Sequence, residues 1–174
     1  PMDAQARWPD FLARALAGQG IAVVNAGISG NRLLSDGMGR SVLARLESDV
    51  LAVPGADTLV LLIGTNDIAW PGSPFAVEEA PMTLERLQAG LQQVAARVHA
   101  RGMRLVLGTV PPFRGALPGT PLEATYWSPE KDRLRRSLND WLRGTSFHDG
   151  LVDFDAVLSA PGDDMRLNPA HDSG

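Results

Sequence analysis

The stretch at residues 59–67, Leu-Val-Leu-Leu-Ile-Gly-Thr-Asn-Asp, constrains the fold of this chain most strongly. Its first five residues are all Leu, Ile or Val, which is typical of a parallel strand buried on both faces of a sheet. A glycine then leads at once to an amide, Asn66, and a carboxylate, Asp67. Open parallel sheets bind ligands outside the carboxyl ends of their strands, so both side chains are candidates for a functional site. The alternative is that they only cap the next turn.

Strand and helix signals alternate along the rest of the chain. Short apolar runs predict strands at 21–25, 58–63, 103–107 and 151–154. Apolar residues at helical spacing predict helices at 8–17, 41–52, 83–100 and 128–142. This alternation predicts a three-layer α/β/α sandwich with a mainly parallel sheet, of the flavodoxin-like type. Two stretches rich in Gly and Pro, 68–80 and 113–127, are predicted as loops, and the tail after residue 155 shows no strong periodicity.

Polar or conformationally special residues follow every predicted strand. In chain order they are Gly27 and Gly30, Asn66 and Asp67, Thr109 to Pro111, and Asp153 and Asp155. The carboxyl ends of parallel strands lie at one edge of a sheet, so we expect these groups to converge.

Composition limits the classes of function. A length of 174 residues predicts one domain spanning 1–174. The net charge is −4 and the arginines are scattered among acids, so no nucleic-acid partner is expected. No apolar run approaches the ~18 residues of a membrane span. The chain has no cysteine, and its histidines do not combine with acids at metal-ligand spacing, so neither a metal nor another cofactor is predicted.

Two blocks carry a family resemblance. Gly-Ile-Ser-Gly-Asn at 27–31 and Gly-Thr-Asn-Asp at 64–67 resemble blocks of the SGNH hydrolases, also called GDSL esterases or lipases. The resemblance continues, in the family's order, through 109–112, 126–129, 152–155 and 166–174. It implies a serine hydrolase of carboxylic esters whose substrate is a small molecule such as an acylated sugar or a lipid. It also favours a secreted or periplasmic location.

The resemblance assigns roles by position. In that family a Ser in a Gly-Asp-Ser block is the nucleophile, and an Asp-x-x-His pair supplies the base. A Gly N–H and an Asn amide complete the oxyanion hole; Gly30 corresponds to that Gly and Asn66 to that Asn. Asp67 has no place in the triad, and we expect it to hold the loop or a neighbouring strand end.

The 174 residues contain neither the Gly-Asp-Ser block nor the Asp-x-x-His pair. The resemblance therefore implies a chain truncated at both ends, without the family's first strand. That strand would lie between 21–25 and 59–63, and its loss would leave unpaired backbone groups. Three explanations stay open: a segment outside this sequence fills the gap, a second copy of the chain fills it, or the sequence is a truncated record.

Residues present in the chain are weaker candidates for these roles. Ser29 lies in the glycine loop but is not the position that the family uses as nucleophile. His171 is interpreted as a surface residue of a polar tail. His99 is expected on the exposed side of a helix, and His148 is expected to pack or cap a turn before the last strand. Glu78 and Glu79 are expected on a solvated face.

Aromatic residues in the two predicted loops are expected to form a substrate rim, with core packing as the alternative. They are Trp70, Phe75, Phe113, Tyr126 and Trp127. Two other functions remain open. One is a flavodoxin-like module that cradles a phosphate, although neither common phosphate-binding glycine motif is present. The other is a non-catalytic SGNH-fold carbohydrate-binding or scaffold protein that lacks the Ser and the His.

Overall fold

A three-stranded parallel sheet forms the centre of the molecule. The computed structural model describes residues 7–171. The strands are β1 (Thr58–Leu61), β2 (Arg104–Gly108) and β3 (Gly150–Val152), in the order β1-β2-β3. Leu59 lies opposite Leu105, and Leu107 lies opposite Leu151. A separate antiparallel pair, β4 (Ser159–Ala160) and β5 (Asp163–Leu167), follows near the end of the chain.

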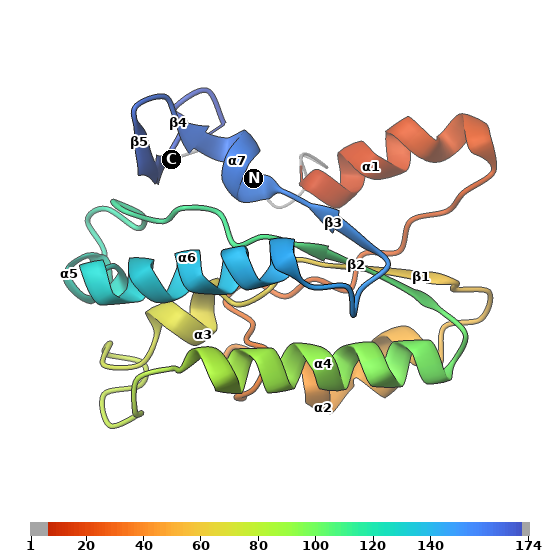
Figure 1. Ribbon diagram of the computed structural model, residues 1–174, viewed down its shortest axis with the longest axis horizontal. Coiled ribbons are helices and arrows are strands. Elements are labelled where there is room, and N and C mark those ends of the chain that lie inside the picture. The colour runs from red at the N-terminus through yellow and green to blue at the C-terminus, as the bar shows by residue number, and fades with distance from the viewer. Residues whose placement is uncertain (1–6, 172–174) are drawn as a thin grey trace.

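Helices connect the strands and cover the sheet. Their bounds are α1 (Trp8–Leu16), η1 (Ala17–Gln19), α2 (Val42–Leu46), η2 (Glu47–Leu51), α3 (Thr65–Ala69), α4 (Leu84–Ala100), α5 (Glu123–Tyr126), α6 (Pro129–Gly144) and α7 (Phe154–Leu158). Helices α2, α4 and α6 each begin after a residue whose side-chain hydroxyl accepts a backbone N–H of the first turn. These capping residues are Ser41, Thr83 and Ser128. In Figure 1, α2 and α4 lie on one side of the sheet and α1 on the other, which gives a three-layer α/β/α architecture.

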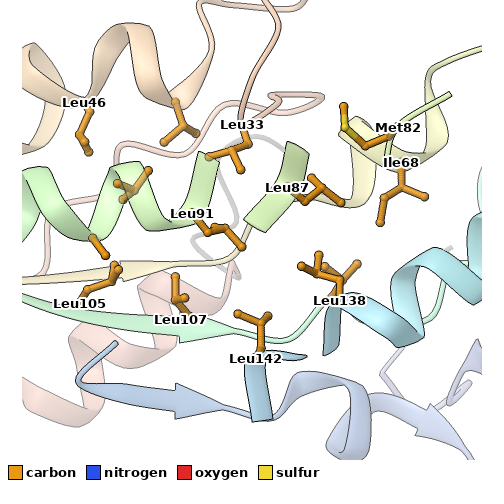
Figure 2. Packing of buried hydrophobic residues seen from close by; sticks show 14 of the residues in the cluster. Leu33, Leu46, Ile68, Met82, Leu87, Leu91, Leu105, Leu107, Leu138 and Leu142 are labelled. Carbon is orange, nitrogen blue, oxygen red and sulfur yellow. The ribbon is translucent and has the colours of Figure 1, made fainter. Parts of the chain in front are cut away.

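The core lies between the sheet and the layer formed by α4 and α6. Leu105 and Leu107 alternate with the less buried Val106 along β2, so two leucines of this strand face the same helical layer. Figure 2 shows Leu87 and Leu91 of α4 facing these leucines, with Leu138 and Leu142 of α6 beside them. None of the described helices is long and apolar enough to cross a membrane.

The predicted helices and the three later strands are confirmed, with small shifts at their ends. The predicted strand at 21–25 is wrong for the described structure, because residues 21–28 have no regular secondary structure. A strand needs a hydrogen-bonded neighbour, and within 7–171 only β2 pairs with β1. Apolar side chains of this segment are consequently exposed, with Val24 at 72% and Ile21 at 50%.

Short elements account for the other differences. The predicted loop at 68–80 begins later than expected, because α3 already starts at Thr65 and runs to Ala69. Phe154 begins α7 and does not end the last strand. The tail forms α7, β4 and β5 although its sequence shows no periodicity. Only two residues of β4 pair with β5, and so short a strand leaves no alternating pattern in the sequence.

Candidate active site

The predicted convergence at the carboxyl edge of the sheet is observed for the segments that follow β1, β2 and β3. Asn66 and Asp67 lie on α3 directly after β1. The Thr109 hydroxyl, after β2, donates to the Asp153 carboxylate, after β3, at 2.9 Å. The loop at 27–31 reaches the same edge, because the Asn66 amide contacts the backbone of Asn31.

Gly30 occupies a position that only glycine fits well. Its φ is +71°, in the left-handed region that side chains with a Cβ disfavour. A Cβ built at this position would lie 2.8 Å from Met38 Cγ and 3.2 Å from Trp70 Cζ2. The backbone of Gly30 therefore lies closely against Met38 and the Trp70 ring.

Asn31 fixes the loop just after Gly30. Its side-chain amide donates to the Arg40 carbonyl at 2.8 Å, and its oxygen accepts from Arg45 at 2.8 and 3.2 Å. Arg45 also donates to the Ala26 carbonyl at 2.6 Å, on the other side of the loop. The loop is thus held by a side chain from α2, which leaves the Asn31 carbonyl to accept from Asn66.

Asp67 anchors the next part of the same loop. Its carboxylate is completely buried and accepts the N–H of Leu33 at 2.8 and 3.0 Å and that of Leu34 at 3.1 Å. Burial raises the pKa of Asp67, while these two N–H groups act in the opposite direction by favouring the carboxylate. The expectation that Asp67 holds the loop is confirmed.

The Asn66 amide is half-buried and held on both sides. Its Nδ2 donates to the Asn31 carbonyl at 3.1 Å, and its Oδ1 accepts from the Tyr126 hydroxyl at 2.9 Å. An amide nitrogen carries two hydrogens, and the described residues accept only one of them. Since Asn31 follows Gly30 directly, the structure brings the two residues that the sequence singled out into one place.

A comparison with protein families identifies the family of the chain. The sequence profile of the GDSL-like lipase/acylhydrolase family matches residues 2–173. The chain belongs to the GDSL-like lipase/acylhydrolase family. A comparison with the curated proteins gives no match.

Solved structures similar to this GDSL-like chain share its fold. One is a Bacteroides fragilis protein described as an acylhydrolase, with a TM-score of 0.65, 22% identity and 91% of this chain covered. Another, described as a lipolytic protein of the G-D-S-L family from Desulfitobacterium hafniense, has a TM-score of 0.62, 18% identity and 94% coverage. An acetyl-xylooligosaccharide esterase from Geobacillus has a TM-score of 0.52, 24% identity and 95% coverage. The alignments cover 66%, 74% and 68% of those chains, respectively.

The predicted aromatic rim of this GDSL-like chain needs correction. Trp70, Phe113 and Tyr126 are core residues, exposed by 5%, 4% and 8%. Trp70 packs under the glycine loop, and Phe113 meets the Tyr126 ring edge-on with centroids 5.7 Å apart. Trp127 is half-buried beneath the Arg114 guanidinium, and Phe75 is exposed. Core packing therefore explains three of the five: Trp70 lies against Gly30, Tyr126 contacts Asn66, and Phe113 packs against Tyr126.

Glu79 was expected on a solvated face, and this is wrong. It accepts from Arg32 at 2.6 Å and from the Ser35 hydroxyl at 3.3 Å, which ties the segment after α3 to the glycine loop. Arg32 is itself buried, with its guanidinium 5.1 Å from the Trp70 ring centroid. Glu78 is exposed, as predicted.

None of the described histidines has a hydrogen bond to Asn66. His99 pairs with Asp149 at 2.8 Å, and Asp149 also accepts from the Leu105 N–H at the start of β2, the opposite end of that strand. His148 contacts the Leu142 carbonyl near the end of α6, which confirms its capping role. His171 and Ser29 are exposed. Within 7–171 no three His, Asp or Glu side chains are grouped as metal ligands.

Sequence reasoning missed Lys131 and the contact that Tyr126 makes. The Lys131 ammonium donates to the carbonyls of Ala69 and Thr125, both at 2.6 Å. A lysine in the first turn of a helix gives no local signal that it binds carbonyls of two other elements. Tyr126 was selected only as an aromatic residue in a loop, and its hydroxyl contact spans 60 positions of sequence.

Proposed function

We propose that this chain forms the core of a serine-type hydrolase of carboxylic esters, in which the Gly30 N–H and the Asn66 amide are oxyanion-hole donors. The observation that supports the proposal most directly is that hydrogen bonds hold the Asn66 amide in place from both ends. Its carbonyl oxygen is occupied by Tyr126, its nitrogen lies against the residue after Gly30, and one amide hydrogen has no acceptor among the described residues.

These two groups suit the chemistry of ester hydrolysis. Attack on an ester carbonyl converts its oxygen into an oxyanion, and N–H donors already in place stabilise that charge as it develops. Neutral donors such as a backbone N–H and a carboxamide do this without losing a proton. The family resemblance assigns the nucleophile to the Ser of a Gly-Asp-Ser block and the base to the His of an Asp-x-x-His pair.

For the substrate, we propose small carboxylic esters with acyl or acetyl groups, carried by a sugar or a lipid. Support comes from the family and from the name of one structural neighbour, an acetyl-xylooligosaccharide esterase. Because the buried Trp70, Phe113 and Tyr126 are not available to a substrate, the remaining candidates of the predicted aromatic rim are the half-buried Trp127 and the exposed Phe75.

The test is Asn66→Ala in the full-length protein, with p-nitrophenyl acetate as substrate. Loss of one oxyanion-hole donor lowers kcat by about 10²–10³-fold. Gln93→Ala is the control, because it removes an exposed amide from α4 and should leave kcat unchanged. An Asn66→Ala enzyme within about threefold of the wild type would rule out the role of Asn66, since even one donor contributes far more than that.

The same assay separates an enzyme from a non-catalytic member of the fold. A serine-directed phosphonate should abolish hydrolysis by the full-length protein if a serine nucleophile carries the reaction. A protein that neither hydrolyses p-nitrophenyl acetate nor reacts with the phosphonate would instead be a binding or scaffold protein.

A further inference from the structure

We propose that Tyr126 is a positioning residue for Asn66: its hydroxyl, together with the Asn31 carbonyl, holds the amide with its nitrogen toward the site. The inference rests on the proposed function, because it assigns a partner to a group of that same oxyanion hole. The contact itself is direct, with the Tyr126 hydroxyl 2.9 Å from Asn66 Oδ1.

An asparagine needs such a partner if it is to stabilise an oxyanion. Rotation of the carboxamide by half a turn exchanges its oxygen and nitrogen, and the oxygen would repel the charge that the nitrogen stabilises. Asn31 contributes a backbone carbonyl, which can only accept, so the amide atom at 3.1 Å from it is the nitrogen. The Tyr126 hydroxyl then donates to the remaining oxygen, and the two contacts favour the same orientation.

The surroundings of Tyr126 keep its hydroxyl a donor. Only 8% of the residue is exposed, and burial raises the pKa of Tyr126 to about 12. The phenol therefore keeps its proton at any pH suitable for ester hydrolysis. Phe113 packs edge-on against the ring and limits its movement, so the hydroxyl stays directed at Asn66.

Lys131 links the helices that carry the two partners. Its ammonium donates to the carbonyl of Ala69, the last residue of α3, and to that of Thr125, the residue before Tyr126. Both distances are 2.6 Å, and burial lowers the pKa of Lys131. One side chain of α6 thus holds α3, which carries Asn66, beside α5, which carries Tyr126.

The experiment is Tyr126→Phe in the full-length protein, assayed for kcat and KM with p-nitrophenyl acetate. The variant keeps the ring and removes one hydrogen bond, so we expect kcat to fall roughly five- to tenfold with KM nearly unchanged. Thr120→Val is the matched control, because it removes a hydroxyl of the same connecting segment that donates to the Leu117 carbonyl at 2.8 Å and accepts from the Leu122 N–H at 3.3 Å. It should change kcat by less than about twofold.

A double-mutant cycle distinguishes positioning from a merely structural effect. If Tyr126 acts through Asn66, Tyr126→Phe should change kcat by less than about twofold when Asn66 is already alanine. An equal fall in both backgrounds, or no fall in the wild type, would overturn the inference while leaving the effect of Asn66→Ala intact. An unchanged kcat for Asn66→Ala alone would remove the proposed function itself.

Lys131 provides a second variant should Tyr126→Phe fail to fold. Lys131→Met should lower kcat in the same direction, and Lys131→Arg should restore it, because a guanidinium can also donate to two carbonyls. Loss of kcat in both Lys131 variants alike, at unchanged thermal stability, would contradict the role of the two-carbonyl link.

Discussion

At the scale of single residues, neighbouring polar side chains at the end of β1 have opposite roles. Asp67 turns inward and is completely buried on the N–H groups of Leu33 and Leu34. Asn66 is half-buried beside Asn31, and one of its two amide hydrogens has no acceptor among the described residues. Asp67 therefore fixes the position of the loop that Asn66 touches, so loop geometry and the proposed chemistry depend on adjacent residues.

Substituting Asp67 by asparagine tests this anchoring role. The change replaces one carboxylate oxygen by an NH2 group facing the N–H groups of Leu33 and Leu34, leaving a buried donor without an acceptor. We expect the free energy of unfolding in urea to fall by about 2–4 kcal/mol. Asp140→Asn is the control, since the Asp140 side chain is 76% exposed and forms a surface pair with Arg143. A change within about 0.5 kcal/mol for Asp67→Asn would contradict the anchoring role.

At the scale of elements, a buried ion network attaches α6 to the segment after β3. Arg135 of α6 is almost completely buried and binds Asp132 at 2.9 Å, Asp155, and the carbonyls of Val110 and Asp164. Arg143, in the last turn of α6, binds Asp153 and lowers the pKa of that carboxyl to about 2. These contacts fix α7 and β5 against α6, although neither element has a long stretch of sheet pairing.

Arg135→Met should therefore destabilise the protein far more than an equivalent change on the helix surface. Removing one partner of a buried ion pair costs about 3–5 kcal/mol, and Asp132 and Asp155 each lose a guanidinium contact. Arg133→Met on the same helix breaks only an exposed pair with Glu130 and should cost about 0–1 kcal/mol. Urea unfolding measures both values, and similar costs for the two variants would contradict the structural role of the network.

Elements with strong periodicity were predictable, and elements that depend on distant contacts were not. The apolar spacing along 83–100 and 128–142 predicted α4 and α6, because each helix buries one face in the core. Residues 21–25 have the apolar character of a strand but no described hydrogen-bonding neighbour, which local sequence cannot reveal. The β4–β5 pair is held by Arg135 and Arg136 at Asp164, contacts 28 or 29 positions apart.

The candidate site was likewise predictable where it depends on local sequence and unpredictable where it depends on distant contacts. Gly30 and Asn66 were recognisable from their blocks and from their positions after apolar runs. Their surroundings were not: Trp70 and Tyr126 were assigned to a substrate rim, yet both are buried, Trp70 against Gly30 and Tyr126 against Asn66. A residue's type predicts its chemistry, whereas its burial depends on loops whose course the sequence pattern does not specify.

At the scale of the whole molecule, the outer edge of β1 is free among the described residues. β1 pairs with β2 alone, and the segment at 21–28, which leads into the glycine loop, exposes Ile21, Val24 and Ile28. The same glycine loop is nevertheless held in place by hydrogen bonds that involve Asp67, Arg45 and Glu79. The geometry of Gly30 and Asn66 is therefore set by contacts within 7–171, while the partner of the free edge stays a prediction.

The most direct measurement of the central claim is a crystal structure of the full-length protein after reaction with a serine-directed phosphonate. The phosphonyl oxygen occupies the place of the oxyanion, so it reports the donors of the hole. We predict that it lies about 2.7–3.1 Å from both the Gly30 nitrogen and Asn66 Nδ2, with Tyr126 still bonded to Asn66 Oδ1. An oxygen bound by neither group, with the two donors directed elsewhere, would contradict the claim.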